Sequence, residues 1–267
     1  MKFSGNLIKM RSEYTNPVTY FLKLGDSELK MNELLGKLLL LKYTGTIHCI
    51  QCGKRTSKSY SQGYCYNCML TAPQADESVV RPELSKAQFG IARDMEWSKE
   101  NDLIDHFVYL SVTSGLKVGV TRSHQLFTRW IDQGAAQAIK LSCTPNRHIA
   151  GITEVFLKKY AADKTNWLKM LSGDTTHQIN LIDEKARLSA LLPSELQQYS
   201  ERDNTIYPIF YPVQSIPGLL YQISLEQNAE ISGRLVGIRG QYLIFDDGGV
   251  LNIRKYSGYF VDFSIMD

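Results

Sequence analysis

The chain has 267 residues, of which 43% are hydrophobic and 21% charged, and its formal net charge is +3. This length allows one large or two modest domains. The longest apolar stretch, around residues 34–41, is short and is interrupted by Gly36 and Lys37, and the first residues lack the apolar core of a signal peptide. We therefore expect a cytoplasmic protein with no membrane partner, in which thiols stay reduced.

The charges are unevenly distributed along the chain. Residues 43–70 carry three basic side chains and no acidic ones, and residues 106–170 carry nine basic against three acidic. The stretches 71–105 and 171–267 are both acidic. Two basic segments between acidic ones suit a surface that binds a polyanion, although ordinary surface charge remains an alternative.

The first elements in chain order are strands. Loose alternation of apolar and polar residues predicts strands over residues 2–10 and 18–24, and a run of aliphatic residues predicts another over 37–43. We expect residues 1–48 to form the N-terminal part of a β-rich body.

Two CxxC pairs follow, with twelve residues between them. Each pair lets two thiolates reach one ion from a single tight turn, and two pairs complete the tetrahedral S₄ site that zinc fills. Since all the ligands are cysteines, the pattern predicts a structural zinc rather than a catalytic one, with a redox dithiol or a pair of disulfides as the alternative. The predicted zinc knuckle spans residues 49–70, and its ligands are Cys49, Cys52, Cys65 and Cys68.

The knuckle also interleaves basic and aromatic residues. This pattern suits nucleic-acid contact by phosphate pairing and base stacking, although ribbons of this composition also dock proteins. The candidate nucleic-acid-binding residues of the knuckle are Lys54, Arg55 and Lys58, beside Tyr60 and Tyr64.

Residues 71–105 are polar, acidic and irregular, and we expect a linker or an extended loop. A compact unit is predicted over residues 106–174, in the order hairpin, helix, strand, helix. Its predicted elements are strands at 107–112 and 116–121, a helix at 123–132, a strand at 138–143 and a helix at 145–160. Residues 175–267 are expected to begin with helix at 183–199, as a pair or broken at Pro193, and to return to strands. These strands are predicted at 221–224, 234–238, 242–245, 250–254 and 259–263.

The unit at 106–174 resembles the GIY-YIG nuclease core. Phe107-Val108-Tyr109 stands at the place of the first motif, and Lys117-Val118-Gly119 at the place of the second. Arg129 matches the arginine of the family's first helix, Glu154 matches its metal-binding glutamate, and Asn166 loosely matches a late polar residue. The sequence departs from the motifs at Phe107, where the family has Gly, and at Lys117, where it has a second Tyr or, in some branches, Lys.

This resemblance implies metal-dependent phosphodiester cleavage. A phenol or amine helps to deprotonate the attacking water, an arginine neutralises charge on the phosphate, and one carboxylate holds one divalent cation. The implied catalytic residues are Tyr109, Lys117, Arg129 and Glu154, with Mg²⁺ or Mn²⁺ at Glu154. Arg122, directly after the second motif, is a further candidate for phosphate binding.

Over nearly its full length the chain also resembles a bacterial domain-of-unknown-function family with an N-terminal Cys₄ knuckle. The sequence segments that carry this resemblance include residues 114–122, 128–135, 165–167, 240–245 and 252–255. We therefore expect an α+β protein with a β-rich body from both termini, a small Cys₄ zinc knuckle and a GIY-YIG-like core. The predicted function is nucleic-acid binding, with cleavage as a further activity. The alternative is a non-catalytic protein-interaction scaffold with a degenerate nuclease-like core.

Overall fold

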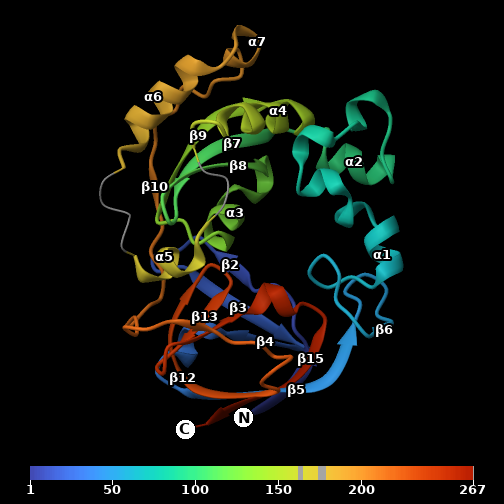
Figure 1. The fold of residues 1–267 in the computed structure, drawn as a ribbon, viewed down its shortest axis with the longest axis vertical. Helices are drawn as coiled ribbons and strands as arrows, with labels where there is room; N and C mark the ends of the chain where they lie inside the picture. The colour runs from blue at the N-terminus through green and yellow to red at the C-terminus, as the bar shows by residue number, and fades with distance from the viewer. Residues whose placement is uncertain (162–164, 174–178, 267) are drawn as a thin grey trace. The chain divides into compact units, whose positions relative to one another are not determined.

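The computed structural model describes residues 1–161, 165–173 and 179–266, and this part of the chain forms two compact units (Figure 1). Unit 1 comprises residues 1–75 and 210–267, and unit 2 comprises residues 76–209. The β-rich unit 1 is thus built from both ends of the chain. The boundary expected between residues 174 and 175 lies outside the described residues. In the described part of the chain, no helix has both the length and the apolar character needed to cross a bilayer.

The main sheet of unit 1 has eight strands among the described residues. Its spatial order is β1-β15-β5-β12-β13-β14-β11, and β6 pairs with β5 at the side. All pairs are antiparallel except the short β11–β14 pair. The strands are β1 (Lys2–Asn6), β5 (Leu38–His48), β6 (Arg55–Thr56), β11 (Tyr221–Gln222), β12 (Glu230–Arg239), β13 (Tyr242–Phe245), β14 (Gly249–Asn252) and β15 (Tyr259–Met266).

Strand β5 organises this sheet, since β12 and β15 pair along its two sides. Its alternate residues Leu39 and Leu41 are buried, as are Val261 and Phe263 of β15, so the aliphatic run supplies one face of the core. Beyond residue 43, where the predicted strand ended, β5 continues to His48 and leads directly into the first CxxC pair.

A second sheet of unit 1 contains β2 (Arg11–Glu13), β3 (Thr19–Leu24) and β4 (Ser27–Lys30), followed by the 3₁₀ helix η1 (Met31–Leu34). The prediction of a single strand over residues 2–10 is wrong in its extent. The observed strand β1 ends at Asn6, and the next strand, β2, belongs to the second sheet. Between them the backbone of Met10 is bonded at both its N–H and its C=O by the buried side chain of Gln241, which substitutes for strand pairing.

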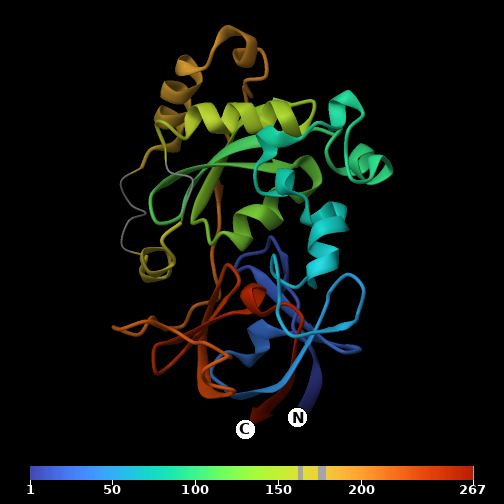
Figure 2. The ribbon, with the colours of Figure 1, turned by 45° about the vertical axis from the view of Figure 1, so that its right-hand side comes forward.

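Unit 2 is built on a four-stranded antiparallel sheet in the order β10-β9-β7-β8. Helix α4 covers one face, where its Ala150 and Leu157 join Val108, Leu110 and Val118 in the core. The opposite face carries α3, as Figures 1 and 2 show. The strands are β7 (His106–Val112), β8 (Leu116–Arg122), β9 (Gln137–Thr144) and β10 (Tyr207–Pro208), and the helices after them are η6 (Ser123–Gln125), α3 (Leu126–Asp132), α4 (Arg147–Leu157), α5 (Trp167–Ser172), α6 (Leu181–Leu191) and α7 (Ser194–Gln197).

The predicted order of hairpin, helix, strand and helix is present, and local signals explain its limits. Asn146 begins α4 by accepting a hydrogen bond from the Ile149 N–H, and Gly134 follows α3 with a φ of 70°. The expected break of the later helix at Pro193 separates α6 from α7.

Residues 71–105, where the sequence indicated a linker or an extended loop, differ from that expectation. They form a series of short helices, and η4 packs against α4. A Cβ at Gly151 of α4 would lie 2.1 Å from the backbone nitrogen of Glu83, so the absence of a side chain at Gly151 permits this contact. After α1 (Tyr66–Thr71), which ends the knuckle, the helices are η2 (Pro73–Ala75), η3 (Glu77–Val79), η4 (Pro82–Leu84), η5 (Ala87–Phe89) and α2 (Met95–Asn101).

Candidate functional site

The first candidate site is the cluster of four cysteines in unit 1. The first CxxC pair directly follows strand β5, and the second CxxC pair lies at the start of α1. The sulfur atoms of Cys49, Cys52, Cys65 and Cys68 all lie within 4.8 Å of one another. All four thiols are free, and the Cys52 and Cys65 sulfurs are 3.9 Å apart. Tetrahedral zinc with Zn–S bonds of about 2.3 Å places its sulfurs ~3.8 Å apart, so the residues present fit a zinc ion.

The turns of the knuckle are shaped to bring these sulfurs together. Gly53 and Gly63 have φ values of 70° and 129°, which other residues rarely adopt, and the carbonyl of Cys49 accepts a hydrogen bond from the Gly53 N–H. Burial raises the pKa of the Cys49 thiol, but backbone N–H groups of Cys65, Cys52 and Gln51 outweigh it and lower that pKa to about 6. Burial and the hydrogen bonds of the neighbouring thiols raise the pKa of Cys68 to about 12, so without a metal ion Cys49 is the more acidic thiol of the cluster.

The basic candidates of the knuckle lie on its surface. Lys54, Arg55 and Lys58 are exposed, and the Lys58 ammonium lies 5.2 Å from the centre of the Tyr60 ring. His48 is no member of the sulfur cluster, because its Nδ1 is 2.9 Å from the side-chain oxygen of Asn6. The knuckle thus presents cations and aromatic rings around a closed Cys₄ site.

The second candidate site lies in unit 2 beside the edge strand β8. Tyr109, in the middle of β7, is fully buried and lies opposite Gly119 of β8. With its amide oxygen facing the guanidinium, Gln133 accepts hydrogen bonds from Arg129 Nε and Nη2 at 3.0 and 3.1 Å. The Gln133 amide nitrogen then donates to the Tyr109 hydroxyl at 2.9 Å. The structure therefore brings Tyr109 and Arg129 together through Gln133.

Glu154 lies on α4, which covers the face of the sheet opposite α3 (Figure 1). It is 8% exposed, and its carboxylate is 3.5 Å from the Lys158 Nζ one turn later. Burial raises the pKa of Glu154, while the charges of Lys158 and Arg129 lower it. Burial also raises the pKa of Tyr109, again opposed by Arg129, and the charge of Glu154 adds to the increase. Tyr109, Arg129 and Glu154 thus come from three elements and act electrostatically on one another.

Lys117 makes a different contact. It is buried in β8, and its Nζ donates to the Thr165 hydroxyl at 3.2 Å. Asn166, next to Thr165, begins α5 by accepting a hydrogen bond from the Lys169 N–H. This hydrogen bond ties Lys117 to the segment before α5.

Two further arginines lie near Arg129. Arg122 donates to the Asn101 carbonyl at 2.8 Å, and its guanidinium lies 5.2 Å from the centre of the Trp97 ring. Arg147 is 6% exposed and donates to the carbonyls of Ser78 and Val79 at 2.7 Å each. Burial lowers the pKa of Arg147 to about 10, and the charges of Arg122 and Arg129 contribute to that decrease. Asp102, whose carboxylate lies 3.9 Å from Arg147 Nε, is the acidic group that acts on both Arg147 and Arg122.

Sequence reasoning missed Gln133 and Arg147. Gln133 lies directly after the helix predicted over residues 123–132, yet its spacing of four from Arg129 places both on one helical face, which is a signal that the sequence contains. Arg147 has no such signal, because its partners Ser78 and Val79 lie in the stretch that was expected to be a linker.

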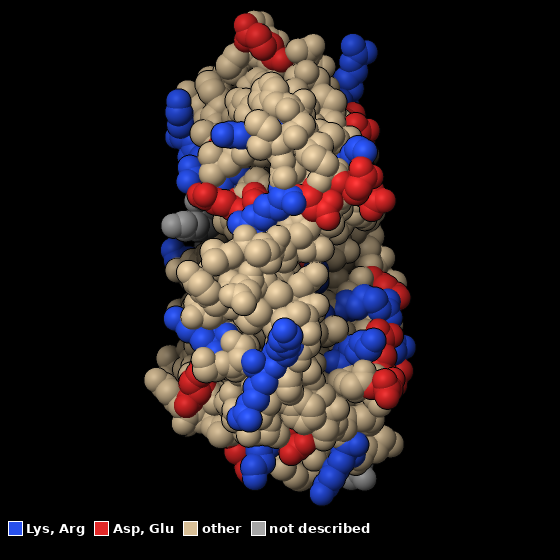
Figure 3. Space-filling view, turned by 90° about the vertical axis from the view of Figure 1, so that its right-hand side faces the viewer, with Lys and Arg blue, Asp and Glu red and all other residues tan. Residues whose placement is uncertain are grey.

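Basic side chains do not form one continuous patch on the face drawn in Figure 3. Lys and Arg are interspersed there with Asp and Glu. Any binding of a polyanion on this face therefore depends on local groups rather than on a broad basic surface.

Comparison with known proteins and protein families identifies the family of this chain. Neither the curated proteins nor the solved structures contain a match to this chain. A family model described as "Protein of unknown function (DUF2797)" matches residues 36–261, a range that includes the cysteine cluster, all of unit 2 and most of the C-terminal strands. The chain therefore belongs to this domain-of-unknown-function family.

Proposed function

We propose that this protein binds nucleic acid, with structural zinc in the knuckle and phosphate contacts from the basic residues of the knuckle and of unit 2. The observation that carries the proposal is the environment of Arg129. Its guanidinium binds the neutral amide of Gln133, and among the described residues no carboxylate lies within ion-pair distance of it. A half-buried guanidinium held by neutral partners keeps N–H donors for a phosphate, which it binds in bidentate geometry.

Phosphodiester cleavage of the GIY-YIG type is the second candidate, and the electrostatic coupling of Tyr109, Arg129 and Glu154 favours it. In this candidate Glu154 holds Mg²⁺ or Mn²⁺, and Arg129 neutralises charge that develops on the phosphate. Tyr109 is fully buried with a raised pKa, so the site must open before its phenol can assist an attacking water. Lys117 remains the fourth catalytic candidate.

One assay tests both activities. Labelled single- and double-stranded DNA and RNA are incubated with the purified protein, with Mg²⁺ or Mn²⁺, beside Arg129→Ala, Glu154→Gln and Lys117→Ala. Arg187→Ala is the matched control, since Arg187 is an exposed arginine of α6 that pairs with Glu184. We expect Arg129→Ala to weaken binding about tenfold, because a hydrogen bond to a charged group contributes roughly 1.5–3 kcal/mol, and we expect the control to bind normally.

The outcomes separate the candidates. Metal-dependent cutting that both Arg129→Ala and Glu154→Gln abolish establishes the nuclease. Binding that falls with salt but produces no cutting supports recognition alone. If the wild-type protein binds none of the four substrates, nucleic-acid binding is overturned, and the protein-interaction scaffold with a degenerate core becomes the function to test.

A further inference from the structure

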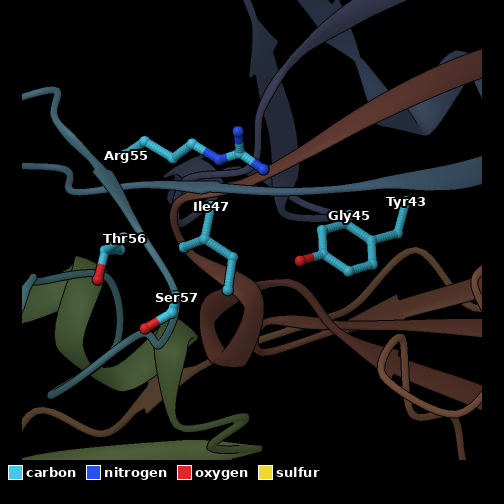
Figure 4. A pocket seen from close by; sticks show the side chains of 6 residues that line it. All are labelled: Tyr43, Gly45, Ile47, Arg55, Thr56 and Ser57. Carbon is cyan, nitrogen blue, oxygen red and sulfur yellow. The ribbon is translucent and has the colours of Figure 1, made fainter.

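A groove in unit 1 lies directly beside the zinc knuckle (Figure 4). Its volume is about 500 Å³, and it is open to solvent. The lining residues come from the second half of β5 and from β6 with the residue after it, and they are Tyr43, Gly45, Ile47, Arg55, Thr56 and Ser57. The volume falls within the ~300–1,000 Å³ range of small-molecule sites.

The groove combines three kinds of surface. Figure 4 shows Ile47 between the Tyr43 ring on one side and Thr56 and Ser57 on the other, with the tyrosine hydroxyl pointing toward Ile47. At Gly45, which has a φ of 80°, an added Cβ would meet no atom within 4 Å, so a ligand can approach the backbone there. An aromatic face, an open stretch of backbone and a cation with hydroxyls therefore line one groove.

Two opposite charges act on Tyr43. Burial raises the pKa of its phenol, the carboxylate of Glu226 raises that pKa further, and the guanidinium of Arg55 opposes both. Glu226 is held by the Tyr259 hydroxyl at 2.8 Å, whereas the exposed Arg55 forms no ion pair among the described residues. Arg55 and Tyr43 line the same groove, so a ligand in contact with the ring has the guanidinium available for an anionic group.

We propose that this groove is a single-nucleotide subsite for single-stranded nucleic acid, in which a base stacks on Tyr43 and its phosphate binds Arg55. This inference rests on the proposed nucleic-acid binding and specifies the strand form that the knuckle recognises. Bases of a duplex are already stacked inside the helix, whereas a single strand can offer a base face to an aromatic ring. Arg55 adds a phosphate contact that carries no sequence preference.

The zinc knuckle fixes one wall of this subsite. Strand β6, Arg55–Thr56, lies between the two CxxC pairs and pairs with β5 at Ile47 and His48. The Cys49 N–H also donates to the Lys54 carbonyl at 2.9 Å, which ties the first pair to the residue before Arg55. The metal site therefore positions the residues that we assign to the phosphate.

The test measures the affinity of the zinc-loaded, full-length protein for two labelled strands. One is a thymidine oligonucleotide of about 12 nucleotides, within the range of known single-strand sites, and the other is an abasic strand of the same length. The variants are Tyr43→Leu, Tyr43→Phe and Arg55→Ala. The matched controls are Tyr14→Leu and Lys2→Ala, which change an exposed tyrosine and an exposed cation of unit 1 outside the groove.

We expect Tyr43→Leu to weaken binding of the thymidine strand about tenfold, since stacking contributes ~1–3 kcal/mol per base, and to leave the abasic strand unaffected. Tyr43→Phe keeps the ring and should bind normally. Arg55→Ala should weaken both strands and lower the slope of log affinity against log salt by about 0.7.

Two results would overturn the subsite while leaving nucleic-acid binding in place. One is an Arg55→Ala protein whose slope of log affinity against log salt equals that of the wild type. The other is an equal effect of Tyr43→Leu on the affinity for both strands. If the wild-type protein binds neither strand, the subsite falls together with the proposed function.

Discussion

Tyr109 occupies the middle of unit 2 because the residue opposite it has no side chain. An added Cβ at Gly119 would lie 2.5 Å from the Tyr109 hydroxyl oxygen and 2.6 Å from the ring carbon that bears it. The strand pairing that sets Gly119 opposite Tyr109 thus determines where the phenol lies. The Gln133 amide nitrogen then donates a hydrogen bond to the Tyr109 hydroxyl. The glycine of the second motif has a steric role that is independent of any catalysis.

Gly119→Ala tests this role. We expect a loss of about 2 kcal/mol in the free energy of unfolding, as for other insertions of a methyl group into a packed core, measured by urea titration. Gly115→Ala is the control, since a Cβ there would meet no atom within 4 Å. Equal stability of the two variants would show that the Tyr109 ring can move without loss.

His106 should make the stability of the protein depend on pH. The ring is fully buried, its Nδ1 donates to the Ile104 carbonyl at 2.8 Å, and its Nε2 has no partner among the described residues. Burial, opposed by the hydrogen bond to Ile104 and aided by the nearby charges of Arg147, Arg122 and His124, lowers the pKa of His106 to about 3. Because this pKa is below the value of about 6.5 in the unfolded chain, the stabilisation is complete above pH 6.5 and is lost as the pH falls toward 3.

At pH 5 this group alone should remove about 2 kcal/mol of the stability present at pH 7. The measurement compares the free energy of unfolding at the two pH values for the wild type, His106→Gln and the exposed-site control His124→Gln. The loss of unfolding free energy between pH 7 and pH 5 should be about 2 kcal/mol smaller in His106→Gln than in the wild type. In His124→Gln this loss should equal that of the wild type. A decrease of the same size in His106→Gln and the wild type would count against the buried neutral ring.

At the scale of elements, the Cys₄ knuckle is the part whose folding we expect to depend most directly on a metal ion. Helix α1 has six residues with none of them buried, and β6 has two, so the knuckle has little core of its own. Metal binding supplies apparent free energies of ~10–16 kcal/mol in zinc-finger peptides. A comparable contribution here would stabilise the turns that carry Gly53 and Gly63.

Metal analysis of purified protein checks the site. We expect one zinc ion per chain in the wild type and in Cys143→Ser, which changes the cysteine outside the cluster. Cys68→Ser should lose the metal and become sensitive to proteolysis between residues 49 and 70. Zinc retained at full stoichiometry in Cys68→Ser would mean that this thiol is no ligand.

The sequence predicted the hairpin, helix, strand and helix from β7 to α4 and the cysteine cluster because their signals are local. Paired CxxC turns and helix-capping residues such as Asn146 act within a few positions of the chain. The packing of η4 on α4 was not predictable, since it depends on a small residue, Gly151, far from Glu83 in sequence. The same holds for the split of residues 2–10, where the decisive partner is Gln241.

At the scale of the whole molecule, the two units carry separate cores and different optical reporters. All three tryptophans, Trp97, Trp130 and Trp167, belong to unit 2, whereas the cysteine cluster belongs to unit 1. Tryptophan fluorescence therefore reports on unit 2, and far-ultraviolet circular dichroism reports on both units.

Removal of zinc with a chelator should separate the two signals. We expect the dichroism to show an additional transition at lower urea concentration, while the tryptophan midpoint stays in place, because the cysteine cluster lies in unit 1 and the tryptophans lie in unit 2. The Cys143→Ser protein treated in the same way serves as the control for thiol effects. A tryptophan midpoint that moves with the dichroism would show that the units unfold as one.

The position of β5 in the sheet also determines the order in which a ribosome-bound chain can fold. Strand β5 ends at residue 48, yet its two neighbours, β12 and β15, begin at residues 230 and 259. Unit 2 is translated completely within this interval, so it can fold while β5 still has both long edges unpaired. Such exposed edges are sites of association with other chains. Early zinc capture by the nascent knuckle, which needs only the first 68 residues, would therefore protect one end of β5 until its partners emerge.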